Sequence, residues 1–291
     1  MTAWEDRYWW SNDGLRLHAR DYSRDAGGLP IICLPGLTRN ARDYDVFARR
    51  LASRHRVLAV DLRGRGESAY ARDPMSYVPL TYAQDLAALL AEQKIDRFIA
   101  VGTSLGGTVI MLMAGMMPGR IGGVLFNDVG PEIDPAGLAR VRGYVGRSST
   151  WPTWMHAARA IQETHGEIYP DWGVEEWLAM AKRLYRLNNA GRIVIDYDLK
   201  IAEPFRVPGS AAGPDMWRAL ATLGSAPVLV VRGGRSDMLP AAVAERMVEL
   251  LPQAELITLP GIGHAPTLGE PGVQGAIDRW LARAAVEPAS T

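Results

Sequence analysis

This chain of 291 residues has one cysteine, no excess of charge of either sign and no long apolar run. The single cysteine, Cys33, excludes an intrachain disulfide framework and a cluster of cysteine metal ligands, and we expect no metal site. The 32 basic and 32 acidic residues cancel, so the charge balance indicates neither a nucleic-acid partner nor an anionic membrane. The most apolar stretch, residues 109–117, is far shorter than the roughly 20 residues of a membrane span.

The first residues, Met1 to Arg7, carry acidic side chains and lead into no apolar stretch. A secretory signal needs a basic start and an apolar segment, so we expect none here. The low cysteine content fits a reducing compartment. We therefore expect a cytoplasmic protein.

The glycine-rich stretch 100–107 contains the clearest motif of the chain, Gly-x-Ser-x-Gly centred on Ser104. A short apolar run precedes it and a longer helical pattern follows it, which predicts a strand, a sharp turn and a helix. Side chains two positions from the serine would collide in such a turn, and Gly102 and Gly106 remove them. The serine hydroxyl would then lie at a helix N-terminus, where free N–H groups stabilise negative charge.

Apolar strand-like runs alternate with helical patterns on both sides of this motif. Residues 8–10 and 15–20 flank an Asp-Gly turn and read as a hairpin, and buried-type strands are expected at 31–34, 57–60, 97–101, 124–127, 228–231 and 256–259. Repeated strand–helix–strand order predicts a mostly parallel sheet with helices on both faces.

The alternation stops between residues 131 and 216, where we find helical patterns and no convincing buried strand. We predict a core domain made of residues 1–130 and 217–291, interrupted by a helical insertion at 131–216. Tryptophan, tyrosine and methionine crowd this insertion. We expect Trp154, Trp177 and Met238 to contact a substrate. The alternative is that the aromatic residues form the small core of the insertion itself, which such side chains do more often, and Trp154 and Trp177 lie on the amphipathic stripes that are expected to be buried.

A serine becomes a nucleophile when a histidine takes its proton and a carboxylate orients that histidine. His264 follows the 256–259 strand in a glycine-rich loop, and Asp237 follows the 228–231 strand. Parallel strands end at one edge of the sheet, so we predict that Ser104, His264 and Asp237 meet there. Asp128, directly after the 124–127 strand, is the alternative acid.

The developing oxyanion requires two N–H donors. We expect the backbone amide of Leu105, the residue after the serine, and that of Leu37 in the loop after the 31–34 strand. Cys33, close by in sequence, is expected to pack as a small apolar residue. His156 and His165 are expected to be solvated, with contact to a substrate as the alternative, and no cluster of arginine or lysine indicates a carboxylate or phosphate clamp.

The elbow at Ser104, the order serine–acid–histidine, the segment 61–68 and Gly261-Ile262-Gly263-His264 resemble the α/β-hydrolase superfamily over residues 12–285. The resemblance implies an eight-stranded α/β-hydrolase fold with an inserted cap, a triad of Ser104, Asp237 and His264, and oxyanion amides at Leu37 and Leu105. Many members carry His-Gly in the oxyanion loop, where this chain has Pro35-Gly36. Serine at the elbow argues against opening of epoxides or displacement of halide, for which members typically use aspartate.

These features predict a serine hydrolase that cleaves carboxylic esters of small to medium, largely apolar substrates through an acyl-enzyme on Ser104. A carbon–carbon bond hydrolase, a lactonase or a cofactor-free perhydrolase could use the same triad, and a binding protein on a hydrolase scaffold is a further alternative. We expect a small-molecule substrate and no cofactor. Whether the chain forms a homodimer is open at this point.

Overall fold

The computed structural model describes residues 3–206 and 215–285. Residues 1–2 of the N-terminal stretch and 207–214 of the predicted insertion lie outside the described residues.

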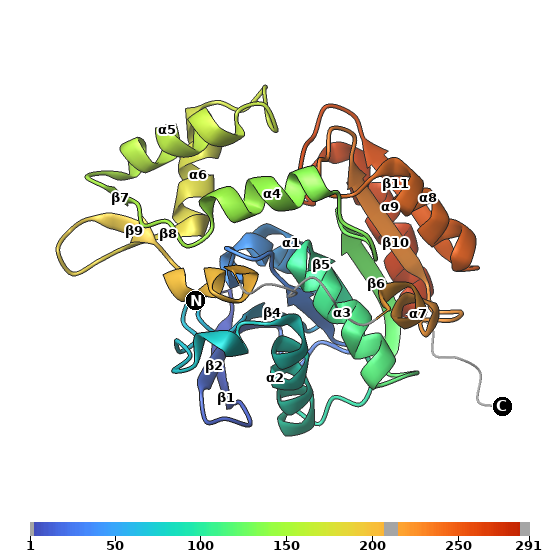
Figure 1. Cartoon of the computed structure of the whole chain (residues 1–291). Helices are drawn as coiled ribbons and strands as arrows, with labels where there is room; N and C mark the ends of the chain where they lie inside the picture. Colours follow the sequence, from blue (N-terminus) through green and yellow to red (C-terminus); the bar gives the residue numbers. More distant parts are fainter. Residues whose placement is uncertain (1–2, 207–214, 286–291) are drawn as a thin grey trace.

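An eight-stranded sheet runs through the molecule in the order β1-β2-β4-β3-β5-β6-β10-β11 (Figure 1). β2 runs antiparallel to both of its neighbours, and the remaining pairs are parallel. The predicted mostly parallel sheet of eight strands is confirmed. Its strands are β1 (Glu5–Trp10), β2 (Arg16–Tyr22), β3 (Ile31–Leu34), β4 (Val57–Asp61), β5 (Phe98–Thr103), β6 (Ile121–Asn127), β10 (Val228–Gly233) and β11 (Ala254–Leu259).

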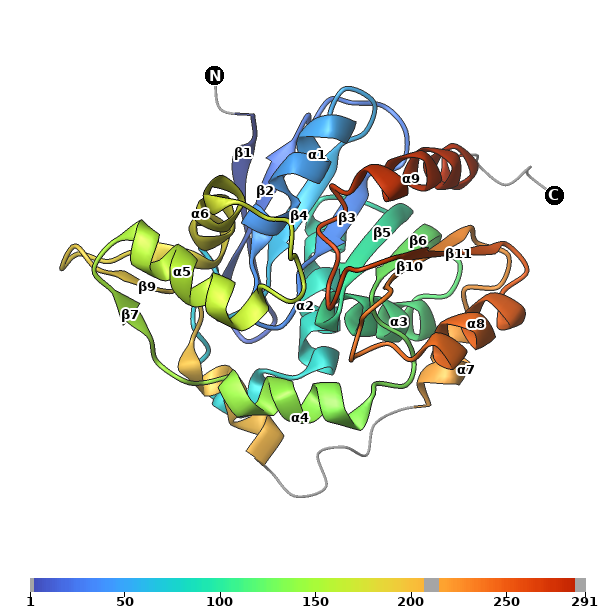
Figure 2. The same cartoon turned by 90° about the horizontal axis from the view of Figure 1, so that it is seen from above.

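Helices cover both faces of this sheet, as Figure 2 shows from above. Helices α2 (Pro79–Glu92), α3 (Leu105–Met116), α7 (Met216–Ala221) and α8 (Ala241–Leu250) pack on one face, and α1 (Asp45–Leu51) and α9 (Pro271–Ala284) on the other. Alternate residues of a strand point to opposite faces. Accordingly Ala100 of β5 packs in the hydrophobic core on the α2–α3 face of the sheet. Its neighbours Ile99 and Val101 pack in the core on the α1–α9 face.

The central strands are buried on both faces, and their sequences are therefore apolar runs with little alternation. Every residue of β3, β4 and β6 is buried, whereas β1 at one edge of the sheet is largely exposed. These runs are the reason that the sheet can be read from the sequence.

Residues 128–206, after β6, form a separate layer of structure (Figure 1). It contains helices α4 (Pro135–Tyr144), α5 (Trp154–His165) and α6 (Val174–Leu184), and 3-10 turns at Leu199–Ala202 and Pro204–Arg206. It also contains a three-stranded antiparallel sheet of β7 (Thr150–Trp151), β8 (Tyr185–Leu187) and β9 (Ile193–Ile195). The insertion is thus mixed rather than purely helical. Strands of two or three residues with one buried side chain, Ile193, give no apolar run to detect.

Candidate active site

Ser104 occupies the turn between β5 and α3. Its backbone has φ 51° and ψ −119°, a conformation in which an L residue is strained. The flanking glycines make this turn sterically possible. A Cβ on Gly102 would lie 2.5 Å from the amide nitrogen of Gly107, and one on Gly106 would overlap the carbonyl oxygen of Leu34. The turn projects the hydroxyl at the start of α3, as the sequence predicted.

His264 lies in the loop after β11, and its imidazole reaches the serine. The distance from His264 Nε2 to Ser104 Oγ is 3.0 Å. The histidine side chain is 12% exposed, so the pair lies at the floor of an accessible site. Geometry of this kind allows a neutral imidazole to accept the hydroxyl proton.

Asp128, directly after β6, holds the other nitrogen of the imidazole at 2.7 Å from Nδ1 to Oδ2. The carboxylate is fully buried and also accepts hydrogen bonds from Ser236 Oγ at 2.6 Å and from the Gly233 amide at 2.9 Å. A buried carboxylate in this position fixes the Nδ1–H tautomer and leaves Nε2 free to accept a proton. The structure therefore gives the His264 contact to the alternative acid of the sequence analysis.

Asp237, the acid we predicted, forms no hydrogen bond with His264. Its side chain is 40% exposed and makes a bidentate pair with Arg140 of α4, with Arg140 Nη2 at 2.9 Å from Asp237 Oδ1. The Arg140 guanidinium holds the pKa of Asp237 below its usual value. The prediction that Asp237 contacts the His264 imidazole is therefore wrong. Asp237 instead links the loop after β10 to α4 of the insertion through Arg140.

Leu37 and Leu105, the predicted oxyanion residues, both line the same cavity as Ser104. The loop of Leu37 lies against Ser104, since a Cβ on Gly36 would be 3.7 Å from the Ser104 Cβ. Leu105 is the first residue of α3, where a helix leaves its amides without internal partners. The loop of Leu37 and the first residue of α3 therefore both lie beside Ser104, and the use of their amides as oxyanion donors stays a prediction.

A chain of hydrogen bonds that was not predicted from the sequence links polar side chains at the ends of these strands. Thr103 Oγ1 lies 2.8 Å from the Tyr44 hydroxyl and 3.0 Å from Asn127 Nδ2, which also donates to the Pro266 carbonyl at 2.8 Å. The insertion holds the histidine loop as well, because the Tyr169 hydroxyl donates to the carbonyl of Ala265 at 2.6 Å. The sequence signal for this chain of hydrogen bonds was a polar residue at the end of two apolar strands, Thr103 in β5 and Asn127 in β6.

A cavity of about 1150 Å³ opens above Ser104 between the strand-end loops and the insertion. Met238 lines it, and its contact with a substrate stays a prediction, but Trp154 and Trp177 do not line it. Trp177 is 2% exposed and packs with Ile161 and Met180 in the core of the insertion, and Trp154 packs against that core. The prediction that these two tryptophans contact substrate is wrong: an amphipathic stripe identifies the side that is buried, not what buries it.

Other aromatic, apolar and charged side chains line the cavity instead. Five arginines and three carboxylates contribute to it: Arg39, Arg140, Arg142, Arg147, Arg183, Asp43, Glu163 and Glu176. The sequence shows no arginine cluster because residues 39, 140 and 183 come to one cavity only in the folded protein. His165 also lines the cavity and is only half-buried, and burial together with Arg39 lowers its pKa to about 4.

His156 and Cys33 stay outside this chemistry. His156 is exposed and bonds to Thr153, as expected of a solvated residue. Cys33 is fully buried in the core, and burial raises the pKa of its thiol well above the usual range.

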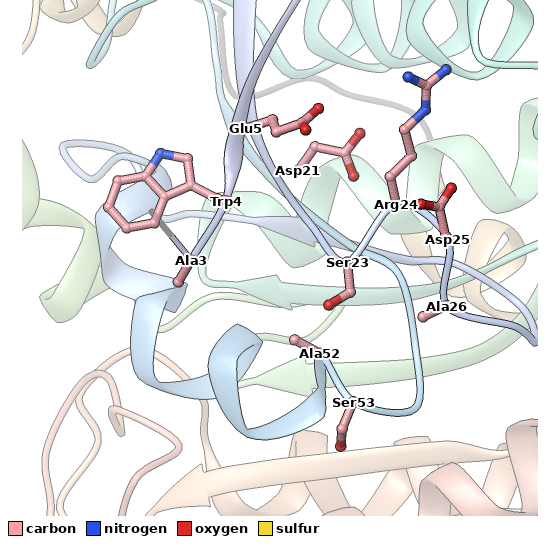
Figure 3. A pocket seen from close by; sticks show the side chains of 10 residues that line it. All are labelled: Ala3, Trp4, Glu5, Asp21, Ser23, Arg24, Asp25, Ala26, Ala52 and Ser53. Atoms are coloured by element: carbon pink, nitrogen blue, oxygen red, sulfur yellow. The ribbon is translucent and has the colours of Figure 1, made fainter. Parts of the chain in front are cut away.

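A second hollow, of about 540 Å³, lies at the edge strands far along the sheet and is shown in Figure 3. Its carboxylates include Asp21, which Arg56 and Arg7 already bind. It holds no side chain of the serine site.

Within residues 3–206 and 215–285, no three His, Cys, Asp or Glu side chains are grouped so that they could bind a metal ion. No helix in this part of the chain has the length and hydrophobicity to cross a membrane.

Comparison with known proteins adds to this geometry. Residues 31–274 match the family described as "Alpha/beta hydrolase family". The chain is 31% identical over 263 residues to a 3-hydroxybutyrate-oligomer hydrolase of Cupriavidus necator, covering 88% of this chain and 89% of that protein. It is 26% identical to a 2-(acetamidomethylene)succinate hydrolase of Mesorhizobium japonicum, with 83% and 84% coverage. A crystal structure of an α/β hydrolase from Novosphingobium aromaticivorans DSM 12444 superposes with a TM-score of 0.93 at 55% identity, covering 97% and 99% of the two chains.

Proposed function

This chain belongs to the α/β-hydrolase family, and from that premise we propose that it is a serine hydrolase that cleaves carboxylic esters through an acyl-enzyme on Ser104. The observation that carries the proposal is the series of hydrogen bonds from Ser104 through His264 to Asp128, with distances of 3.0 and 2.7 Å. A serine, a base and a buried acid in this order are what acyl transfer requires.

Each residue has a definite part in the proposed reaction. His264 Nε2 takes the proton of Ser104 as the oxygen attacks the ester carbonyl, and Asp128 stabilises the imidazolium. The tetrahedral oxyanion accepts hydrogen bonds from the amides of Leu37 and Leu105. His264 then protonates the departing alcohol, and a water molecule, activated by the same imidazole, releases the acid and restores Ser104.

The experiment compares the purified wild-type protein with Ser104→Ala on p-nitrophenyl acetate and butyrate. We expect the variant to lose at least about 10³-fold in kcat, since the nucleophile is removed. Ser53→Ala is the matched control, because Ser53 is an exposed serine on the edge of the distant hollow. Full activity of Ser104→Ala on both esters would refute the proposal.

Covalent labelling provides a test that does not depend on the substrate. A fluorophosphonate should modify Ser104 in the wild-type protein and should not label Ser104→Ala, and mass spectrometry of the peptide containing residue 104 locates the adduct. No labelling of the wild-type protein would favour a binding protein on a hydrolase scaffold.

The relatives guide the choice of substrates beyond simple esters. One is named a 3-hydroxybutyrate-oligomer hydrolase, which places oligoesters of 3-hydroxybutyrate in the panel beside lactones and a dienoate carbon–carbon substrate. The ratio of kcat/KM between an ester and its rivals then decides the bond type. We expect the esters to exceed the carbon–carbon substrate, because His264, beside Ser104, can deliver a proton directly to an alkoxide leaving group.

A further inference from the structure

Arg39 and Arg183 meet inside the cavity, although 144 positions separate them in the sequence. Both approach the same carboxylate oxygen, Asp43 Oδ1, at 3.5 Å from Arg39 Nη1 and 3.7 Å from Arg183 Nε. Both also point at the sulfur of Met180, at 3.4 and 3.2 Å. The two guanidinium groups therefore lie side by side with one carboxylate between them, which leaves one positive charge uncompensated within the group.

These are loose contacts by the standard of the other arginines in this protein. Arg63 and Arg56 hold their buried carboxylates at 2.6 and 2.7 Å. A guanidinium forms its strong interactions through two short parallel hydrogen bonds to one carboxylate. Among the described residues Asp43 is the one acidic partner of Arg39 and Arg183, and it lies beyond that short range for both. Donor capacity facing the cavity is thus left for a ligand.

The electrostatics of the surrounding side chains agree with an excess of positive charge. Burial lowers the pKa of Arg183, and the neighbouring Arg39 lowers it further, against the opposing effect of Asp43. Burial lowers the pKa of His165, which also lines the cavity, and Arg39 lowers it further. A cavity in which cations repel each other stabilises an incoming anion.

The cluster is close to the nucleophile. A Cβ on Gly36 would lie 3.5 Å from Arg39 Cγ and 3.7 Å from Ser104 Cβ, so the stem of Arg39 begins beside the serine. A single small molecule can therefore reach Ser104 and a guanidinium together. Arg140 is less suited to this role, because Asp237 already binds it in bidentate fashion.

We propose that Arg39 and Arg183 form a carboxylate-binding site and that the natural substrates are esters bearing a free carboxylate. This inference rests on the proposed function and narrows its substrate class. The anionic end binds between the guanidinium groups while the ester carbonyl lies at Ser104. The prediction of largely apolar substrates is revised accordingly: apolar side chains line much of the cavity, but one end of the ligand is charged.

The test compares kcat/KM for an ester that carries a free carboxylate with kcat/KM for its neutral methyl ester. Mono-p-nitrophenyl glutarate is compared with its methyl ester, p-nitrophenyl methyl glutarate, which carries no charge and has the same reacting bond. A second pair, 3-(butanoyloxy)butanoate and its methyl ester, places the carboxylate on the alcohol side. For at least one pair we expect kcat/KM to favour the anion about 10- to 100-fold, as for a charge-assisted hydrogen-bonded pair.

Arg183→Gln should reduce that preference by about 10-fold or more, through KM, and Arg39→Gln should do the same. Arg186→Gln is the matched control: it makes the same change three positions away, on an exposed arginine that pairs with Asp196 outside the cavity. The control should keep the wild-type preference. No preference for the anion in either pair, or a preference that survives both cavity variants, would overturn the carboxylate site.

Failure of this site is distinguishable from failure of the hydrolase proposal. If the neutral esters are hydrolysed in a Ser104-dependent way without preference, the carboxylate site alone is wrong. Calorimetry with glutarate on Ser104→Ala measures binding without turnover. Binding that Arg183→Gln weakens about 10-fold supports the site even if no ester is cleaved, and no binding contradicts it.

Discussion

Replacing Asp128 by asparagine is expected to lower kcat about 10⁴-fold, which corresponds to about 5 kcal/mol of lost transition-state stabilisation. The amide keeps the shape of the carboxylate but can donate a hydrogen bond to His264 Nδ1, now 2.7 Å from Oδ2. The imidazole then carries its proton on Nε2 and donates to Ser104 rather than accepting from it. The geometry survives and the base is lost.

The fold should tolerate this change at a moderate cost. The Gly233 amide can still donate to the remaining carbonyl oxygen, but the hydroxyl of Ser236 loses its carboxylate acceptor at 2.6 Å. One disturbed buried hydrogen bond costs about 1–3 kcal/mol of unfolding free energy. The backbone of residue 128 has φ 55°, which asparagine adopts more readily than most residues. Urea unfolding therefore separates the two effects, since a folded variant with low kcat reports on the base.

Asp237→Asn is the matched comparison, because it makes the same chemical change in a neighbouring loop. Its partner is Arg140, and both side chains are 40% exposed, so the pair contributes at most about 1 kcal/mol. We expect kcat within about threefold of wild type, a change of less than 1 kcal/mol in the barrier. The assay is steady-state hydrolysis of p-nitrophenyl butyrate at saturating substrate for both variants.

The reverse result would refute the reasoning. If Asp237→Asn lost activity by about 10³-fold while Asp128→Asn remained within tenfold of wild type, the acid that serves His264 in solution would be Asp237. The short contact of Asp128 with the imidazole would then have no role in the reaction.

Three further perturbations test other parts of the structure. Arg65 is buried and donates from Nε to the Leu37 carbonyl at 2.9 Å, so Arg65→Lys should displace the oxyanion loop and lower kcat about tenfold with little change in KM. Burial opposes the charged form of His18, but two carboxylates bonded to it outweigh this and raise its pKa. Its contribution to stability is therefore complete below pH 6.5 and lost as pH rises through the higher folded value, and His18→Gln should flatten that dependence in urea unfolding. Gly106→Ala should cost about 1–3 kcal/mol by overpacking against a backbone carbonyl, while Gly143→Ala, with no atom within 4 Å of its added Cβ, should be neutral or slightly stabilising, as thermal unfolding would report.

The strands of the sheet and the turn at Ser104 could be predicted from the sequence alone, because both depend on interactions that are local along the chain. A strand buried on both faces must be apolar throughout, which marks β3, β4, β5 and β10. A serine in a strained turn between strand and helix needs glycine on either side, which marks residue 104. His264 follows from the same logic, as a polar residue in a glycine-rich loop after a strand.

Only the tertiary structure determined which of the two aspartates contacts His264. Asp128 and Asp237 follow strands that are neighbours in the sheet, so strand order places both at the same edge. The choice depends on partners from distant segments, since Ser236 and His264 surround Asp128 and Arg140 of the insertion binds Asp237.

The contents of the cavity were likewise beyond the sequence. An amphipathic helix shows which side is buried, but whether a neighbouring helix or a ligand covers it depends on how the insertion folds, as Trp177 illustrates. Arg39 and Arg183 come from segments that no local pattern connects, and only the packing of α6 against the loop after β3 brings their charges together. Local sterics and hydrophobicity are written along the chain, whereas the juxtaposition of charges from distant segments exists only in the folded molecule.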